Sequence, residues 1–121
     1  MFRWKYKKEF VRTKPTLEVE KLADFLRVYG WKVETEKWDG YKHIDISITE
    51  VGVNIEVDGK HHNTNPIQAL TDLKRTFFSF KKGYVTLRIP NCLVRNNETI
   101  KETASFINDF LKSSEQQLEY Y

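Results

Sequence analysis

The stretch Val53-Asn-Ile-Glu-Val-Asp-Gly59 decides the fold, because apolar and polar residues alternate along it without a break. Successive side chains of a β-strand point to opposite faces, so this alternation predicts a strand with one apolar and one polar face. Its polar face would carry Asn54, Glu56 and Asp58. Residues 43–49 repeat the pattern, with isoleucines on one face and Asp45 and Ser47 on the other. The sequence therefore predicts two neighbouring, half-buried strands.

Helix and strand signals on both sides of these strands complete the pattern. Residues 15–30 predict a helix through the apolar stripe Leu22, Phe25, Leu26 and Tyr29. Residues 31–36 alternate like a strand and precede a turn at Asp39-Gly40. Residues 66–82 predict a helix whose core stripe would be Leu70, Leu73, Phe77 and Phe80. Residues 84–89 are expected to form a strand and 98–112 a last helix. The order α-β-β-β-α-β-α indicates an α/β fold with a central mixed sheet flanked by helices.

Length and composition fit one globular domain over residues 1–121, with 40% hydrophobic and 31% charged residues. The single cysteine, Cys92, excludes an internal disulfide and a cysteine-built zinc site, which favours an intracellular protein. No apolar run approaches the roughly 18 residues of a membrane helix, so no membrane association is expected. Residues 113–121 are expected to form a loosely held tail.

Positive charge is concentrated at the N-terminus, although the net charge of +3 alone does not indicate a nucleic-acid partner. Aromatic residues alternate there with the basic residues Arg3, Lys5, Lys7 and Lys8. Basic groups neutralise phosphates and aromatic rings stack on bases, which predicts a DNA-binding arm over residues 1–14. The same period-two pattern also fits an edge strand whose aromatic face packs on the core.

The polar faces of the two central strands bring carboxylates together. Asp45 lies on one strand, and Glu56 and Asp58 lie on the next. Such a group repels itself unless a cation or a shared proton neutralises it. Carboxylate oxygens suit Mg²⁺, or Mn²⁺ in its place, and such a metal can activate water beside a phosphoryl group. The alternative is an ordinary polar sheet face exposed to solvent.

Two further groups of residues lie next to this cluster. Lys60, His61 and His62 follow the turn at Gly59, where a lysine can stabilise negative charge and a histidine can act as a base. A polar stripe on the helix over 66–82 could border a phosphate channel or simply face solvent: Gln68, Asp72, Arg75 and Ser79.

These residues resemble the PD-(D/E)xK nuclease superfamily. Ile44-Asp45 followed by Asn54-Ile-Glu-Val-Asp-Gly-Lys-His-His62 is similar to its very-short-patch-repair-like branch, whose members carry an Ile-Glu-x-Asp-Gly-x-x-His strand end. The likeness continues through the polar stripe, with Gln68, Asp72 and Arg75, and through Lys82-Gly-Tyr-Val-Thr-Leu-Arg-Ile-Pro90. It covers residues 16–107 and implies a restriction-endonuclease-like core.

The resemblance implies cleavage of DNA with Mg²⁺. Asp45, Glu56 and Asp58 would be the metal ligands, and Glu18 would assist from the first helix in preference to Glu20. Asp58 stands where many members of the superfamily have lysine, so Lys60 or the His61-His62 pair would replace that lysine, with His62 favoured as the base. Gln68, Asp72, Arg75 and the basic N-terminal residues would contact DNA.

Three functions remain in competition. The first is a DNA endonuclease, and the second is a Holliday-junction-type resolvase of the same superfamily. The third is a catalytically inactive nucleic-acid-binding domain, which the missing motif lysine favours. A chain of this size could also use a second copy of itself or a specificity subunit to select its DNA.

Overall fold

The computed structural model describes residues 14–59 and 65–120. The elements, in chain order, are helix α2 (Leu17–Val28), strands β1 (Glu34–Trp38) and β2 (His43–Ile48), the 3-10 turn η1 (Thr49–Val51), strand β3 (Val53–Asp58), helix α3 (Pro66–Lys81), strand β4 (Val85–Pro90), and helices α4 (Cys92–Arg95) and α5 (Asn97–Tyr120). The strands form one sheet in the order β1-β2-β3-β4. Its first two pairings are antiparallel and the third is parallel. The predicted α/β class with a mixed sheet flanked by helices is confirmed.

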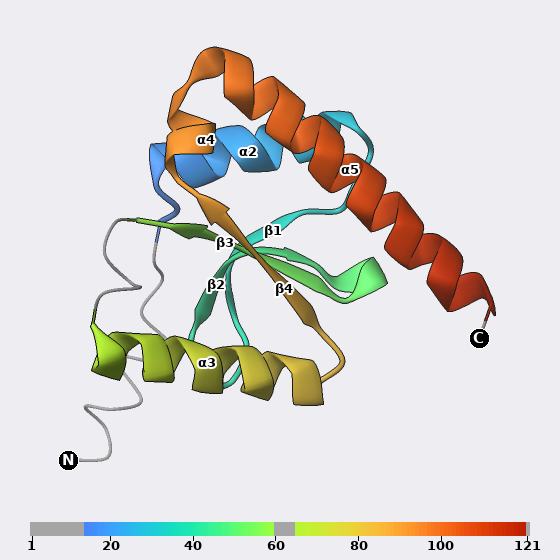
Figure 1. The fold of residues 1–121 in the computed structure, drawn as a ribbon. Helices are drawn as coiled ribbons and strands as arrows, with labels where there is room; N and C mark the ends of the chain where they lie inside the picture. The colour runs from blue at the N-terminus through green and yellow to red at the C-terminus, as the bar shows by residue number, and fades with distance from the viewer. Residues whose placement is uncertain (1–13, 60–64, 121) are drawn as a thin grey trace.

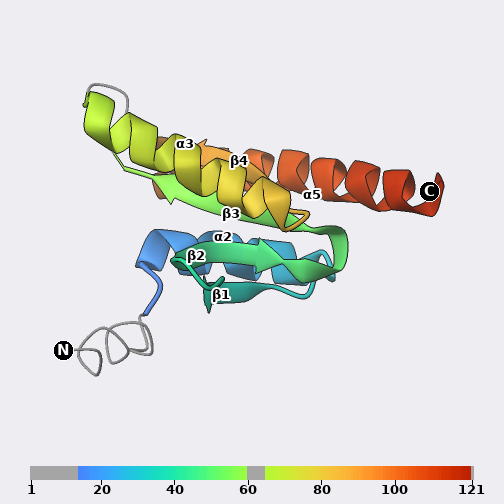
Figure 2. The same cartoon turned by 90° about the horizontal axis from the view of Figure 1, so that it is seen from below.

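The sheet separates two layers of helices (Figure 1). Helices α2, α4 and α5 lie on one side, and α3 lies alone on the other. The turned view shows α3 running along the outside of the molecule, across β3 and β4 (Figure 2). In the ranges that the structure describes, no helix is long and apolar enough to cross a membrane.

The largest departures from the expected boundaries are at the start of β1 and the end of α5. Strand β1 starts at Glu34 because the preceding residues close helix α2: the backbone N–H of Trp31 donates to the Leu26 carbonyl at 3.3 Å. Helix α5 passes the expected end at Lys112 and reaches Tyr120, because residues 113–120 contain neither glycine nor proline to stop it. Residues 113–120, expected to belong to a loosely held tail, therefore continue helix α5.

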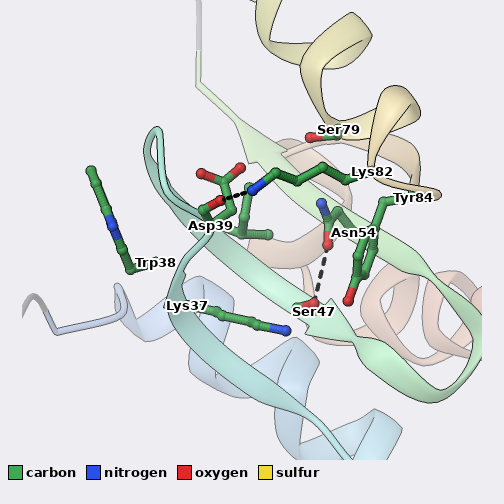
Figure 3. Close-up of a pocket in the computed structure, with 9 residues that line it drawn as sticks. Lys37, Trp38, Asp39, Ser47, Asn54, Ser79, Lys82 and Tyr84 are labelled. Atoms are coloured by element: carbon green, nitrogen blue, oxygen red, sulfur yellow. Dashed lines mark hydrogen bonds between the residues drawn. The ribbon is translucent and has the colours of Figure 1, made fainter.

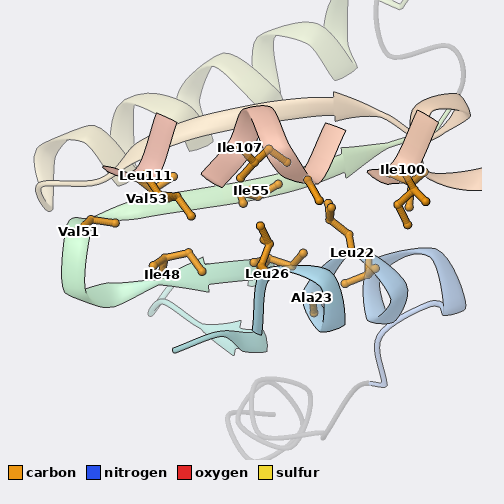
Figure 4. Close-up of a cluster of buried hydrophobic side chains, with 14 residues drawn as sticks. Leu22, Ala23, Leu26, Ile48, Val51, Val53, Ile55, Ile100, Ile107 and Leu111 are labelled. Carbon is orange, nitrogen blue, oxygen red and sulfur yellow. The ribbon is translucent and has the colours of Figure 1, made fainter. Parts of the chain in front are cut away.

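The hydrophobic core fills the space between the sheet and helices α2 and α5 (Figure 4). Burying these side chains supplies the main force that holds the layers together. Among them are Leu22 and Leu26 of α2, Ile46 and Ile55 of the sheet, and Leu111 of α5, all 0% exposed. Tyr29, expected in the α2 stripe, is instead 46% exposed, because it lies after the last turn of that helix.

Helix α3 has the opposite orientation to the one expected. The predicted core stripe is wrong, since its members are between 51% and 67% exposed: Leu70, Leu73, Phe77 and Phe80. The polar side of the helix packs inward, with Ser79 buried and Thr76 accepting a hydrogen bond from Arg88 of β4 at 2.9 Å. The sheet face beneath α3 carries the buried polar residues Ser47 and Asn54, so polar side chains of the helix match it better than apolar ones.

A close backbone contact fixes the start of β3 against the start of β4. Gly52 has φ +66°, and a Cβ at this position would lie 2.7 Å from the carbonyl oxygen of Gly83. The backbone N–H of Val85 donates to the Gly52 carbonyl at 2.9 Å. The parallel register that follows places Glu56 beside Arg88 and Asp58 beside Pro90. The polar end of β3 is thereby held against β4.

Candidate functional site

Asp45 and Glu56 come together where strands β2 and β3 separate. The paired residues of these strands run from Ile48–Val53 to Ile46–Ile55. Beyond that point the Asp45 Oδ2 atom accepts a hydrogen bond from the backbone N–H of Val57 at 2.9 Å. The backbone N–H of Asp45 points at Glu56 Oε2, 3.5 Å away. Side-chain oxygens thus take the place of backbone carbonyls, and two carboxyl groups converge between the strands.

Both carboxyl groups have lost much of their water. Glu56 is 6% exposed, and Asp45 is partly buried. Burial raises the pKa of Asp45 above its ordinary value of 3.8. Burial likewise raises the pKa of Glu56 above 4.5, while the nearby Lys42 ammonium lowers it and the Asp45 charge raises it. A desolvated pair of this kind can share a proton or take up a cation.

Lys42 forms an ion pair with Glu56, joining Lys42 Nζ to Glu56 Oε1. The two side chains are 16% and 7% exposed, so water screens their attraction weakly. Lys42 lies just after the Asp39 turn, whose carboxylate accepts the Lys42 backbone N–H at 2.7 Å. The turn therefore fixes the lysine beside the carboxyl pair.

Asp58, the third predicted ligand, is paired with an arginine. Arg88 Nη1 lies 3.5 Å from Asp58 Oδ1, and Arg88 Nη2 donates to the Asp72 carbonyl oxygen of α3 at 3.3 Å. Two of the three predicted carboxylates have thus been brought together by β2 and β3. Within residues 14–59 and 65–120, no cluster of three acidic, histidine or cysteine side chains is arranged to hold a metal.

The first helix directs its acidic residues elsewhere. Glu18 accepts a hydrogen bond from Arg95 of α4 at 2.8 Å, and Glu20 pairs with Arg27 of its own helix at 3.3 Å. Glu18 is thus tied to the segment that follows β4, whereas Glu20 stays on the outer side of α2. Of the two, Glu18 is the one that contacts a neighbouring element near the end of the sheet.

The polar stripe of α3 faces the sheet rather than open solvent. Gln68, Asp72 and Arg75 are half-buried, and Ser79 is buried. The Arg75 Nε atom is buried without a hydrogen-bond partner. These residues border the layer between α3 and the polar sheet face.

A cavity of about 230 Å³ opens in that layer (Figure 3). Ser47 donates a hydrogen bond to Asn54 Oδ1 at 3.1 Å in its floor. Lys37, Lys82 and Tyr84 stand around it. Lys82 Nζ donates to the Asp39 carbonyl oxygen at 2.7 Å and Lys37 Nζ donates to Thr49 Oγ1 at 3.0 Å.

Two lysines, Lys37 and Lys82, line this cavity together with the acidic residue Asp39. Neither Lys37 nor Lys82 is ion-paired with a carboxylate in the part of the chain that the structure describes. The cavity adjoins the carboxyl pair, since Asn54 and Glu56 share a face of β3 two residues apart, about 7 Å. The two lysine charges suit an anionic group at this position.

Several predicted residues lie outside the described ranges. They are the candidate replacements for the motif lysine, Lys60, His61 and His62, and the basic residues of the N-terminus, Arg3, Lys5, Lys7 and Lys8. Their roles stay predictions.

Sequence reasoning did not identify the basic partners of the carboxylates, Lys42 and Arg88. Lys42 falls on the opposite face to Asp45 by simple alternation, and only the bend after Asp39 brings it to Glu56. Arg88 lies next to Glu56 only through the parallel register of β3 and β4, which no local pattern predicts. Lys37 and Lys82 come from segments 45 residues apart in number, so no local pattern joins them.

No protein-family model, curated protein or solved structure matches this chain. A functional proposal for it therefore depends on the chemistry of these residues.

Proposed function

We propose that this protein is a metal-dependent endonuclease with a restriction-endonuclease-like core, which hydrolyses phosphodiester bonds in DNA. The observation that carries the proposal is the convergence of Asp45 and Glu56 between β2 and β3, where burial raises the pKa of both. Burying two carboxyl groups side by side costs stability, and such costs concentrate at functional sites. The single Cys92 and the DNA substrate together favour action inside the cell.

Asp45 and Glu56 fit the needs of Mg²⁺, which is commonly held by one or two carboxylates together with water and substrate phosphate. We assign these two residues as its ligands, with a backbone carbonyl near Val57. When bound, Mg²⁺ would lower the pKa of a water molecule and neutralise charge on the phosphoryl group. Mn²⁺ can substitute for it.

The remaining residues of the site support this pair. Lys42 balances the charge of Glu56 and holds a positive group beside the position of the phosphate, a role that a lysine of the motif would otherwise have. Arg88 pairs with Asp58, so Asp58 is not assigned as a ligand beside Asp45 and Glu56. The resemblance implies that Glu18 orients the attacking water and that His62 or Lys60 helps to activate it.

The cavity next to the carboxyl pair would hold a neighbouring phosphate of the DNA strand. Lys37 and Lys82 supply positive charge, and Asn54 supplies a polar group on the floor. Contacts of this kind position the strand without reading its sequence. Gln68, Asp72 and Arg75 line the same layer and are proposed to border the DNA path.

The function is tested by incubating supercoiled DNA with the protein in Mg²⁺, Mn²⁺ or EDTA. We expect nicking with either metal and none in EDTA, and at least ~100-fold slower nicking by Glu56→Gln. The matched control is Glu20→Gln, which removes a carboxylate on the outer side of α2 and should nick like wild type. Nicking in EDTA, or by Glu56→Gln at the wild-type rate, contradicts the proposal. Faster cutting of four-way junctions than of linear duplex would favour the resolvase.

The phosphate cavity predicts a change in the salt dependence of DNA binding. The double substitution Lys37→Met/Lys82→Met should weaken binding and lower the slope of log affinity against log salt concentration by about 2, because each lysine releases roughly one counterion. The measurement is fluorescence anisotropy over a salt series without divalent metal. The control pair, Lys101→Met/Lys112→Met on exposed positions of α5, lies on the other side of the sheet. If both pairs of substitutions lower the slope of log affinity against log salt concentration equally, the cavity does not bind the DNA backbone.

A nucleic-acid-binding domain without catalysis is the second candidate. The ion pairs Lys42–Glu56 and Arg88–Asp58 favour it, because each provides a carboxylate with a cation from the chain itself. Calorimetric titration with Mn²⁺ in the absence of DNA separates the two functions. Heat of binding that disappears in Glu56→Gln supports the nuclease, whereas DNA binding without any metal binding supports the inactive domain.

A further inference from the structure

Five large apolar side chains form a continuous exposed line on helix α3. This line, the α3 stripe, is between 51% and 79% exposed and consists of Ile67, Leu70, Leu73, Phe77 and Phe80. These side chains are exposed, whereas Thr76 and Ser79 of the same helix face the sheet. The helix itself runs along the outside of the molecule (Figure 2). A run of this size on a surface usually marks a contact with another macromolecule.

The orientation of α3 is fixed by polar contacts on its inner side. Arg88 of β4 donates to Thr76 Oγ1 at 2.9 Å and to the Asp72 carbonyl oxygen at 3.3 Å. Turning the helix to bury the α3 stripe would break these bonds and press apolar side chains onto the polar pair Ser47–Asn54. The stripe is therefore available to an occupant from outside this part of the fold.

The spacing of the stripe matches a helix–helix seam. Leu70, Leu73, Phe77 and Phe80 are separated by three, four and three residues, as the inward positions of a two-helix coiled coil are. Such a seam requires a partner helix that also has apolar residues in this repeat. A second copy of α3 meets that requirement.

The two edges of the seam differ in charge. Lys74 and Lys81 lie along one edge. Ala69 and the half-buried Thr76, whose hydroxyl accepts from Arg88, lie along the other. In a parallel pair of helices the first edge of one copy faces the second edge of the other, each lysine meeting the residue five positions earlier. In an antiparallel pair centred on the stripe, Lys74 would face its own counterpart. We propose that two copies of this chain associate through parallel α3 helices.

The area of the stripe is consistent with a reversible dimer. A large apolar side chain that is more than half exposed contributes on the order of 100 Å², so five from each copy bury about 1,000 Å² in total. This is near the lower limit for a specific interface, which fits a weak, reversible association. The inference is independent of the nuclease proposal, because none of the stripe residues belongs to the carboxyl site.

Light scattering after gel filtration tests the association from about 1 to 100 µM protein. Wild type should approach twice the 14.5 kDa mass of one chain at the upper end. Phe77→Glu should stay at the single-chain mass with unchanged circular dichroism, because an exposed glutamate does not disturb the monomer. The control Phe106→Glu alters a side chain that is 67% exposed on α5 and should associate like wild type. A wild type that keeps the mass of one chain throughout overturns the proposal, as does a Phe77→Glu variant that associates normally.

Disulfide trapping tests the parallel arrangement and does not require Phe77→Glu to fold. In a Cys92→Ser background, Phe80→Cys should form a disulfide-linked dimer on mild oxidation, because parallel helices place the two copies of residue 80 face to face. An antiparallel pair centred on the stripe would separate them by about 20 Å. Phe106→Cys in the same background is the control. Absence of the Phe80→Cys dimer, or equal trapping by the control, rejects the parallel seam.

Discussion

Replacing Asp45 by asparagine is expected to lower metal-dependent DNA cleavage by ~100-fold or more without lowering the stability of the fold. Asparagine removes the negative charge that a metal ligand requires. It keeps an oxygen that can accept the hydrogen bond of the Val57 backbone N–H, now 2.9 Å from Asp45 Oδ2. The Asp45→Asn variant should therefore lose cleavage activity while it keeps the stability of the fold.

The pKa of Asp45 gives the sign of the stability effect. Burial raises that pKa above 3.8, so the folded chain binds the proton more tightly than the unfolded chain does. Stability then falls as the pH rises from about the ordinary value through the raised value, and at neutral pH the ionised carboxylate destabilises the fold. Asparagine cannot ionise, so Asp45→Asn should lose this pH dependence and unfold at the same or a higher urea concentration than wild type at pH 7.

Urea unfolding at acidic and neutral pH, together with the nicking assay, checks this prediction. Asp109→Asn on α5 provides the control, because Asp109 is exposed and should change neither property. If Asp45→Asn unfolds at much lower urea concentration and still cuts DNA, then Asp45 serves as a structural cap for β3 and is not a metal ligand.

The central strands could be predicted because their information is local. Alternation along residues 53–58 and 43–49 fixes which side chains share a face, and an antiparallel hairpin then places Asp45 near Glu56. Local alternation together with a hairpin therefore predicts the carboxyl pair. What alternation could not give is the separation of the strands beyond Ile46–Ile55, which lets the Asp45 side chain replace a backbone acceptor.

The orientation of α3 could not be predicted, because the amphipathic pattern defines two faces of the helix but not which of them packs on the sheet. The usual assumption is that the apolar stripe points inward. Here one sheet face is already covered by α2 and α5, and the other carries the buried pair Ser47–Asn54. Polar residues of α3 pack on that face, and Phe77 and Phe80 are left outside. Matching of polarity between layers, a non-local property, decided the outcome.

The partners of the acidic residues were equally out of reach of local patterns. Asp58 was expected to join a three-carboxylate cluster, yet Arg88 from the parallel strand β4 pairs with it. No local pattern indicates Lys42, because its contact with Glu56 depends on the path of the turn at Asp39. In both cases a basic residue from a different segment pairs with an acidic residue of the predicted carboxylate cluster.

Lys42 gives the second large effect. Lys42→Met leaves the carboxylate of Glu56, with its side chain 7% exposed, without its ion partner. Removing one member of a buried ion pair costs about 3 to 5 kcal/mol. Because the Lys42 charge lowers the pKa of Glu56, its loss raises that pKa further above 4.5. The deficit relative to wild type should therefore be largest at neutral pH and shrink as the pH falls toward the ordinary range of a carboxyl group.

Two additions to the Lys42→Met experiment distinguish a metal site from a structural ion pair. The double substitution Lys42→Met/Glu56→Gln removes the unpaired charge and should recover most of the lost stability, whereas Lys101→Met at an exposed position of α5 should lose none. Mn²⁺ should raise the melting temperature of Lys42→Met more than that of wild type, because a cation that binds Asp45 and Glu56 then meets no repulsion from a neighbouring ammonium. If Mn²⁺ leaves the melting temperature of Lys42→Met unchanged while the double substitution restores it, the carboxyl pair is structural and does not bind a metal.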